Sequence, residues 1–241
     1  MVENALLVSI ANNKKQFLVR AEGELHTDVG IVNLGAIKAL GFGSTVSTHL
    51  GYEFKVLEPR SPDYFSHLKR TGAPMMPKDI GIIVAYTGLN KEDVVLDAGT
   101  GSGIAAIFLG NIANHVVSYE INPDFAKRAT ENVKQVGLTN VDIIEGDILE
   151  ITSEIEFNVV TLDLHDIGNA IHAVKDCLVP GGFIAAFSPF YEQVFEARNA
   201  LKSFTQIRTF EGIEREIQFG KRGTRPATRV GHTGFVTIAR A

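Results

Sequence analysis

The hydrophobic positions between residues 94 and 190 recur in a regular order. Short apolar runs typical of buried β-strands alternate with helix-like stretches, and these runs lie around Val94, Val116, Val141, Val159 and Phe183. This alternation predicts a doubly wound α/β fold with a parallel sheet that binds ligands at the carboxyl ends of its strands. Two later β-like runs, at residues 204–210 and 233–239, have no clear helix between them. They predict an antiparallel strand pair at the sheet edge.

The first sixty residues have a different pattern. Alternating or apolar runs at residues 5–20 and 46–57 are interrupted by asparagine and glycine, which predicts a compact set of short strands. We therefore expect a small β-rich domain over residues 1–60. The larger domain is expected over residues 61–241.

Two helices are expected where the larger domain begins. Pro59 and Pro62 mark the linker, and residues 63–69 have the pattern of a first helix. Residues 77–87 predict a second helix, because Pro77 suits the first helical position.

Composition limits the classes of protein that fit. The 241 residues are 45% hydrophobic, which supplies one sizeable core. No run of about 18 apolar residues is present, and the N-terminus lacks the pattern of a signal peptide. We therefore expect a cytoplasmic protein without membrane contact.

Cys177 is the only cysteine and the histidines are scattered, so we expect neither an intrachain disulfide nor a metal site. The net charge of -5 disfavours general coating of nucleic acid but permits a local basic patch.

Residues 94–103, VVLDAGTGSG, join an apolar strand to a glycine-rich turn before a helix expected at residues 104–109. A turn that leaves a parallel strand needs positive φ angles, and a side chain there would block the approach of a ligand. Glycine meets both requirements. The pattern predicts a site for a nucleotide-containing cofactor.

The acidic residue in this run, Asp97, bears on the choice of cofactor. A dinucleotide would place its pyrophosphate over the turn, where a carboxylate repels it. S-adenosylmethionine has no phosphate and carries positive sulfonium and ammonium groups, which suit a carboxylate. Gly101, Gly103 and Ala106 nevertheless satisfy the G-x-G-x-x-A form of the nicotinamide fingerprint. A nicotinamide-dependent oxidoreductase is therefore the rival interpretation.

Two further acidic residues follow later strands. Glu120 ends the strand expected at residues 116–119, where a carboxylate can accept both ribose hydroxyls. Asp147 follows the strand expected at residues 141–145 and is placed to meet the adenine amino group, although aspartate at such a position also starts turns. With Asp97, these acids favour S-adenosylmethionine.

Asp163 follows the fourth strand, expected at residues 158–162. If S-adenosylmethionine binds at these strand ends, this position faces the methyl group that the cofactor transfers. Asp163 is therefore the catalytic candidate. A carboxylate there orients an exocyclic amine and stabilises the positive charge that forms when a ring nitrogen is methylated. The nearby His165 is a weaker candidate for proton transfer, because a lone loop histidine more often packs or forms a hydrogen bond.

Several motifs resemble those of the tRNA (adenine-N1)-methyltransferases that modify adenine 58 of the T-loop, and the resemblance covers nearly the whole chain. The motifs are HTDVG at residues 26–30, GYEF at 51–54, KR at 69–70, PKD at 77–79, VSYE at 117–120, RP at 225–226 and VGHTGF at 230–235. The PKD and VGHTGF segments are the specific ones, since the glycine turn alone indicates only a methyltransferase.

The resemblance implies a Rossmann-like class I methyltransferase fold, S-adenosylmethionine as cofactor, tRNA as partner and a homotetramer. It implies that Asp163 holds the target adenine, with adenine 57 as a second candidate target. The complete expected cofactor site is Asp97, Gly99, Gly101, Ser102, Gly103, Ile104, Ala105, Glu120, Phe125, Asp147 and Asp163. One position departs from the family, which has D-L-P where this chain has aspartate, leucine and His165.

A tRNA substrate requires cations. The expected RNA contacts are Lys69, Arg70, Lys78, Lys221, Arg222, Arg225 and Arg229. Residues 220–229 contain no acid, so we expect the basic side chains of this segment to bind RNA phosphates. The alternative is that the segment is a loop that aids solubility or contacts another subunit. Two other functions stay open: a methyltransferase for another base or a small molecule, and a non-catalytic RNA-binding paralogue.

Overall fold

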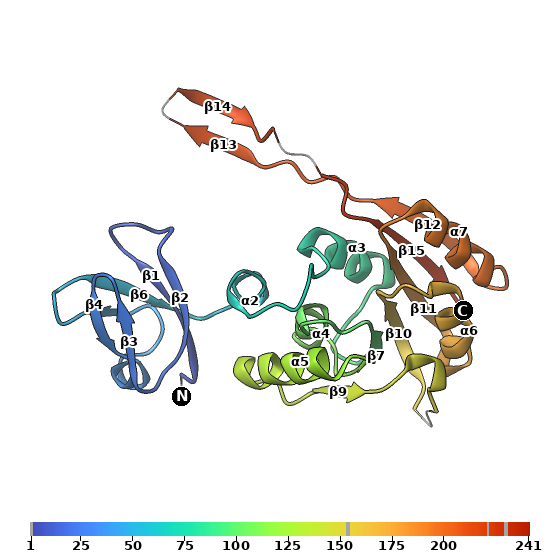
Figure 1. Cartoon of the computed structure of the whole chain (residues 1–241), viewed down its shortest axis with the longest axis horizontal. Helices are drawn as coiled ribbons and strands as arrows, with labels where there is room; N and C mark the ends of the chain where they lie inside the picture. Colours follow the sequence, from blue (N-terminus) through green and yellow to red (C-terminus); the bar gives the residue numbers. More distant parts are fainter. Residues whose placement is uncertain (1, 153–154, 221, 229–230) are drawn as a thin grey trace. The chain divides into compact units, whose positions relative to one another are not determined.

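The computed structural model describes residues 2–152, 155–220, 222–228 and 231–241, which form two compact units (Figure 1). Unit 1 contains the chain up to Lys69 and residues 131–139, and unit 2 contains residues 70–130 and 140–241. The helix α2 (Ser61–His67) falls in unit 1. A division into domains at residue 60 stays a prediction.

Unit 1 is built on an antiparallel sheet with the strand order β2-β1-β6-β5. In β6, Phe54 and Val56 point into the core while Lys55 between them is exposed, as the two-residue period of a strand requires. Unit 1 also contains a separate hairpin of β3 and β4 and two short helical turns, which the sequence analysis did not predict. The elements are β1 (Asn4–Ser9), β2 (Gln16–Arg20), β3 (Glu24–Thr27), β4 (Gly30–Asn33), η1 (Leu34–Ala36), α1 (Ile37–Leu40), β5 (Thr45–Ser47) and β6 (Glu53–Leu57).

The helix α2 begins two residues before the expected start at residue 63. Asp63 accepts a hydrogen bond from the backbone N–H of Arg60 at 2.8 Å, so this carboxylate caps the helix from its first turn. An acid that lies inside a helix in this way is easily taken for its first residue.

Unit 2 contains a seven-stranded sheet in the order β12-β15-β11-β10-β7-β8-β9. The five strands from β11 to β9 are parallel, and β15 runs antiparallel to both β11 and β12. The strands are β7 (Val94–Ala98), β8 (His115–Glu120), β9 (Val141–Glu145), β10 (Phe157–Leu162), β11 (Leu178–Ser188), β12 (Thr205–Glu211) and β15 (Phe235–Arg240). The predicted Rossmann-like sheet with a final antiparallel pair is confirmed.

Helices cover both faces of this sheet (Figure 1). Ala185 and Phe187 of β11 pack with residues of α3, whereas Ile184 and Ala186, which alternate with them, pack with residues of α6 and α7. Because neighbouring strand residues point to opposite faces, these helices lie on opposite sides. The remaining elements are α3 (Pro77–Thr87), α4 (Ile104–Gly110), α5 (Pro123–Val136), η2 (Ile148–Glu150), α6 (Ile167–Val174), η3 (Lys175–Cys177) and α7 (Tyr191–Ala200).

A hairpin of β13 (Ile217–Gly220) and β14 (Gly223–Pro226) interrupts the chain between β12 and β15. Every residue of these two strands is exposed. The hairpin was not predicted, since its residues lack the apolar pattern of a buried strand. In the part of the chain that the structure describes, no helix is long and apolar enough to cross a membrane.

Candidate active site

The glycine-rich turn follows β7 and leads into α4, as the sequence predicts. Gly99, Gly101 and Gly103 have φ angles of +86°, +57° and +78°. A Cβ atom on Gly99 would overlap the carbonyl oxygen of Asp163, and one on Gly103 would lie 3.1 Å from the Cβ of Ala129. The turn therefore needs glycine for its backbone conformation and for close approach.

Asp97 lies near the end of β7 and is 3% exposed. Its two carboxylate oxygens accept hydrogen bonds of 2.5 Å from the hydroxyls of Ser118 on β8 and Thr161 on β10. Burial raises the pKa of this carboxyl group, and the two hydroxyls oppose that change. Asp97 thus joins three neighbouring strands directly beneath the turn.

Glu120, at the end of β8, holds the turn from the other side. Its Oε2 accepts a 2.8 Å hydrogen bond from the backbone N–H of Gly101, and its Oε1 accepts one of 2.9 Å from the backbone N–H of Asn122. Thr100 donates its hydroxyl to the carbonyl of Tyr119 at 2.9 Å. The turn is therefore fixed before any ligand arrives.

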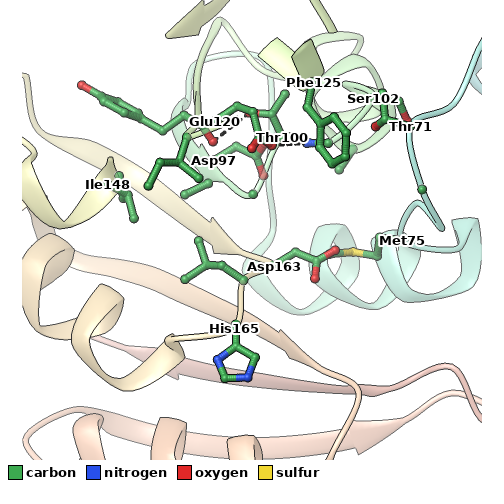
Figure 2. A pocket seen from close by; sticks show the side chains of 18 of the residues that line it. Thr71, Met75, Asp97, Thr100, Ser102, Glu120, Phe125, Ile148, Asp163 and His165 are labelled. Carbon is green, nitrogen blue, oxygen red and sulfur yellow. Dashed lines mark hydrogen bonds between the residues drawn. The ribbon is translucent and has the colours of Figure 1, made fainter. Parts of the chain in front are cut away.

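A cavity of about 550 Å³ opens beside the turn, within unit 2 (Figure 2). The sequence-predicted residues that line it are Asp97, Gly99, Gly101, Ser102, Ile104, Ala105, Glu120, Phe125, Asp147 and Asp163. Of the residues expected in the cofactor site, only Gly103 does not line the cavity. Its positive φ angle helps to form the turn. The structure therefore brings the expected site together from the ends of four parallel strands.

Asp147 lies at the edge of this cavity, after β9. Its Oδ1 accepts a 2.9 Å hydrogen bond from the backbone N–H of Leu149, which caps η2. The residue thus has the turn-starting role considered in the sequence analysis and also lines the cavity.

Asp163 follows β10, and its backbone N–H donates to the carbonyl of Ala98 at 2.9 Å. Burial raises the pKa of its carboxyl group to about 7, with further contributions from the negative charges of Asp97 and Asp79. This carboxyl group can change its protonation near neutral pH inside a cavity. Perturbed carboxyl groups in clefts are typical of functional sites.

The loop after Asp163 carries His165, which also lines the cavity and is exposed. Its carbonyl oxygen accepts a 3.2 Å hydrogen bond from Nε2 of Gln193 on α7. This bond holds the loop at the position where the related family has proline.

Residues 71–75, just before α3, also line the cavity, and the sequence analysis did not identify them. We call them the strap. Met75 is 5% exposed and packs against Ile80 and Phe187, which anchors the end of the strap. Two motifs of the sequence analysis flank this segment, KR at residues 69–70 and PKD at residues 77–79, and neither includes it.

Lys78 and Asp79 of that motif form a buried cluster with Thr233. The Lys78 ammonium lies 2.7 Å from Oδ1 of Asp79 and 2.6 Å from the Thr233 hydroxyl, which in turn donates to Oδ2 of Asp79 at 3.0 Å. The side chain of Lys78 is 13% exposed and that of Asp79 is 0% exposed. The PKD and VGHTGF segments, which are remote in sequence, therefore meet.

His232 adds a second link beside this cluster. Its ring nitrogens lie 2.8 Å from the Pro189 carbonyl oxygen and 2.9 Å from Oε1 of Glu211. Hydrogen bonds to these two acceptors raise the pKa of the imidazole. The loop before β15 is thus tied to β12 and to the loop after β11.

The structure describes five of the seven expected RNA-binding residues. Lys69 belongs to unit 1 and Arg70 to unit 2, and the ammonium of Lys78 is held in the buried cluster. Arg222 and Arg225 are exposed on the β13–β14 hairpin. Lys221 and Arg229 lie outside the described residues. Within the described residues, no group of three or more histidine, cysteine, aspartate or glutamate side chains is arranged to hold a metal.

Comparison with known proteins gives one family model that matches residues 62–225, described as tRNA methyltransferase complex GCD14 subunit. The chain is 35% identical to the tRNA (adenine(57)-N(1)/adenine(58)-N(1))-methyltransferase TrmI of Methanocaldococcus jannaschii, over 94% of this chain and 91% of that protein. It is 33% identical to a tRNA (adenine(58)-N(1))-methyltransferase TrmI of Thermus thermophilus, over 90% of this chain and 89% of that protein.

Solved structures agree with this fold. A SAM-dependent O-methyltransferase from Thermotoga maritima superposes with a TM-score of 0.83 at 29% identity and covers 99% of this chain and 92% of its own. The tRNA (m1A58) methyltransferase TrmI from Aquifex aeolicus superposes with a TM-score of 0.77 at 23% identity. The match covers 99% of this chain and 96% of the Aquifex chain. The fold is that of the class I methyltransferases, which contradicts the nicotinamide-dependent alternative.

Proposed function

The chain belongs to the family of tRNA methyltransferase complex GCD14 subunits, and on that basis we propose that it transfers a methyl group from S-adenosylmethionine to N1 of adenine 58 in tRNA. Adenine 57 is a second candidate target, because the Methanocaldococcus relative is named for both positions. The observation that carries the proposal is the placement of Asp163 in the same cavity as the glycine turn.

The residues of the cavity fit S-adenosylmethionine. A Cβ atom on Gly101 would meet only the Gly99 carbonyl oxygen, at 3.9 Å, so this position leaves room for close approach of a ligand. The hydroxyl of Thr71, which lines the cavity, is buried without a hydrogen-bond partner among the described residues. Glu120 would hold the ribose hydroxyls, Asp147 the adenine amino group, and Phe125 would pack on the ligand. When bound, the cofactor supplies an electrophilic methyl group.

Asp163 would hold the acceptor base. The N1 lone pair of adenine is free, so no strong base is needed to activate it. The Asp163 carboxylate would accept a hydrogen bond from the exocyclic amine and stabilise the cation that methylation produces. Fixing the nitrogen in line with the reacting carbon would supply much of the remaining rate.

tRNA would be bound through cations and by assembly of several copies. Arg222 and Arg225 are exposed on the hairpin and are available to phosphates. The same hairpin carries Ile217 and Phe219, which share one face and are 46% and 83% exposed. An isolated two-stranded hairpin is only marginally stable in water, so the exposure of this apolar face supports the proposed homotetramer, in which another copy would cover it. A cytoplasmic location follows from the proposed substrate.

The variant Asp163→Asn tests the assignment of the acceptor site. Because Asn keeps the shape but loses the charge, we expect methyl transfer to fall by about 100-fold or more, while the affinity for S-adenosylhomocysteine, measured by calorimetry, changes little. Asp176→Asn is the control, because Asp176 is an exposed carboxyl that does not line the cavity. An Asp163→Asn variant that loses cofactor affinity as strongly as it loses activity would assign Asp163 to cofactor binding alone.

A further inference from the structure

A second cavity, of about 450 Å³, lies within unit 2 beside the first one. The loop after β10 and the beginning of α7 form its wall, and the lining residues are His165, Asp166, Phe190, Glu192, Gln193 and Glu196. His165 and Asp166 also line the first cavity, so the two cavities meet at this loop. The volume of the second cavity is in the range of ligand pockets in proteins.

The side-chain amide of Gln193 has only one of its two ends satisfied. Gln193 is 9% exposed, and its Nε2 donates to the carbonyl oxygen of His165. Its Oε1 is buried and has no hydrogen-bond partner among the described residues. Such atoms are rare in folded proteins, because a buried acceptor without a donor costs free energy. A ligand that brings an N–H group into the second cavity would satisfy this oxygen.

Two carboxylates add to the acceptors of this cavity. Glu192 and Glu196 are exposed and lie four positions apart, which places them on one face of α7. Among the described residues, no cation pairs with either of them. Like charges at this spacing destabilise a helix, so the fold itself gains little from the pair. A ligand with hydrogen-bond donors would gain from it.

Phe190 gives the cavity an aromatic face. The residue precedes α7 and is 65% exposed, so its ring is open to stacking by a planar ligand. The lining residues include no lysine or arginine, and the carboxylates would repel a phosphate. An aromatic face with hydrogen-bond acceptors around it is how proteins bind an unstacked nucleobase. Guanine fits these acceptors best, because its N1–H and N2 amine are adjacent donors on one edge.

The position of the cavity indicates which base of the RNA it can reach. In Figure 2 His165 lies on the side of Asp163 remote from Asp97 and Glu120. Asp163, the proposed partner of the target adenine, does not line the second cavity. The target adenine is therefore not the base that this cavity suits. A nucleotide next to the target in the RNA chain is held close by the backbone and can reach it.

We propose that the second cavity binds a guanine that is adjacent in sequence to the target adenine. The base stacks on Phe190, and its N–H groups donate to the Gln193 amide oxygen and to the carboxylates of Glu192 and Glu196. This inference rests on the proposed function, since it requires an RNA substrate. It goes beyond that function, because it assigns part of the choice of RNA sequence to α7.

Methyl transfer to synthetic tRNAs tests the assignment. Each tRNA has adenine at position 58 and either guanine or inosine at position 57 or 59, and inosine differs from guanine only by the loss of the N2 amine. For the unchanged protein, we expect inosine at one of the two positions to lower kcat/KM about 10-fold. In the double variant Glu192→Gln and Glu196→Gln, this preference should fall to about threefold or less, because the charged acceptors are gone. Comparing the same RNAs on both proteins cancels any effect of inosine on RNA folding.

Variants at Phe190 test the stacking contact. Phe190→Ala should lower kcat/KM for the guanine-containing tRNA about 10-fold, whereas Phe190→Tyr keeps the ring and should retain most of the activity. Phe195→Ala is the matched control, because Phe195 is an exposed phenylalanine of α7 that lines neither cavity. Phe190, Glu192 and Glu196 do not line the first cavity. All of these variants should therefore bind S-adenosylhomocysteine as the unchanged protein does.

The outcomes separate this inference from the proposed function. Equal kcat/KM values for guanine and inosine at both positions would overturn the inference and leave the proposed function intact. A guanine preference that the double variant keeps in full would also overturn it, because the carboxylates would then not contact the base. If the unchanged protein methylated none of these tRNAs, the proposed function itself would be wrong and the inference would fall with it.

Discussion

Asp163→Asn should make the protein more stable at pH 8 while removing its activity. The carboxyl group has a pKa of about 7 in the folded protein, against an ordinary value of 3.8, because it is buried near other negative charges. The folded state therefore holds this proton more tightly than the unfolded chain does. As the pH rises from about 4 to about 7, ionisation of Asp163 lowers the free energy of unfolding.

The magnitude follows from the two pKa values. The gap between 3.8 and about 7 corresponds to roughly 4 kcal/mol, at about 1.4 kcal/mol for each pH unit. Since the side chain is half-buried, solvent screens part of this cost, and we expect about 2 to 4 kcal/mol. Asn carries no charge at any of these pH values, so the variant does not incur this cost.

Urea unfolding followed by circular dichroism, at intervals from pH 4 to pH 8, measures the effect. The other titratable groups contribute nearly equally to both proteins, so the difference in unfolding free energy isolates Asp163. This difference should be small at pH 4 and should grow in favour of the Asn variant up to pH 8. A difference that does not change with pH would refute the proposed burial cost of this carboxylate.

Three other predictions concern the turn and the hairpin. Gly99→Ala should lower the free energy of unfolding by more than about 2 kcal/mol, because its Cβ would overlap a backbone oxygen. In urea unfolding, the matched variant Gly88→Ala, with φ +68° but open space, should cost only about 1 kcal/mol. Charge reversal at Arg222 and Arg225 should weaken tRNA binding and reduce its salt slope by about one for each lost phosphate contact; an unchanged slope in filter binding would remove them from the RNA surface. Phe219→Ser should dissociate the proposed tetramer, and an unchanged mass in analytical ultracentrifugation would exclude this face from the subunit contact.

The sequence predicts the sheet and the turn well because local chemistry determines them. The helix Pro77–Thr87 and the strand Val141–Glu145 match their predicted bounds to the residue. The glycines of the turn are required by positive φ angles, a demand that can be read from residue type alone. The parallel order of the strands then brings the acidic strand ends to one cavity.

The parts that were not predicted depend on contacts between remote residues. The ammonium of Lys78 forms a hydrogen bond with Thr233, which lies 155 positions away along the chain. Nothing in the local pattern around either residue indicates that contact. The strap likewise has no hydrophobic period and no charge, and only the folded cavity shows that Thr71 lines it.

The measurement that tests the central claim most directly is transfer of a labelled methyl group from S-adenosylmethionine to unmodified tRNA transcripts, followed by nucleoside mass spectrometry. A second transcript with adenine 58 replaced is the control. The account predicts N1-methyladenosine in the first transcript and its loss, apart from any product at adenine 57, in the second. S-adenosylmethionine binding without any methylated tRNA would contradict the proposed substrate.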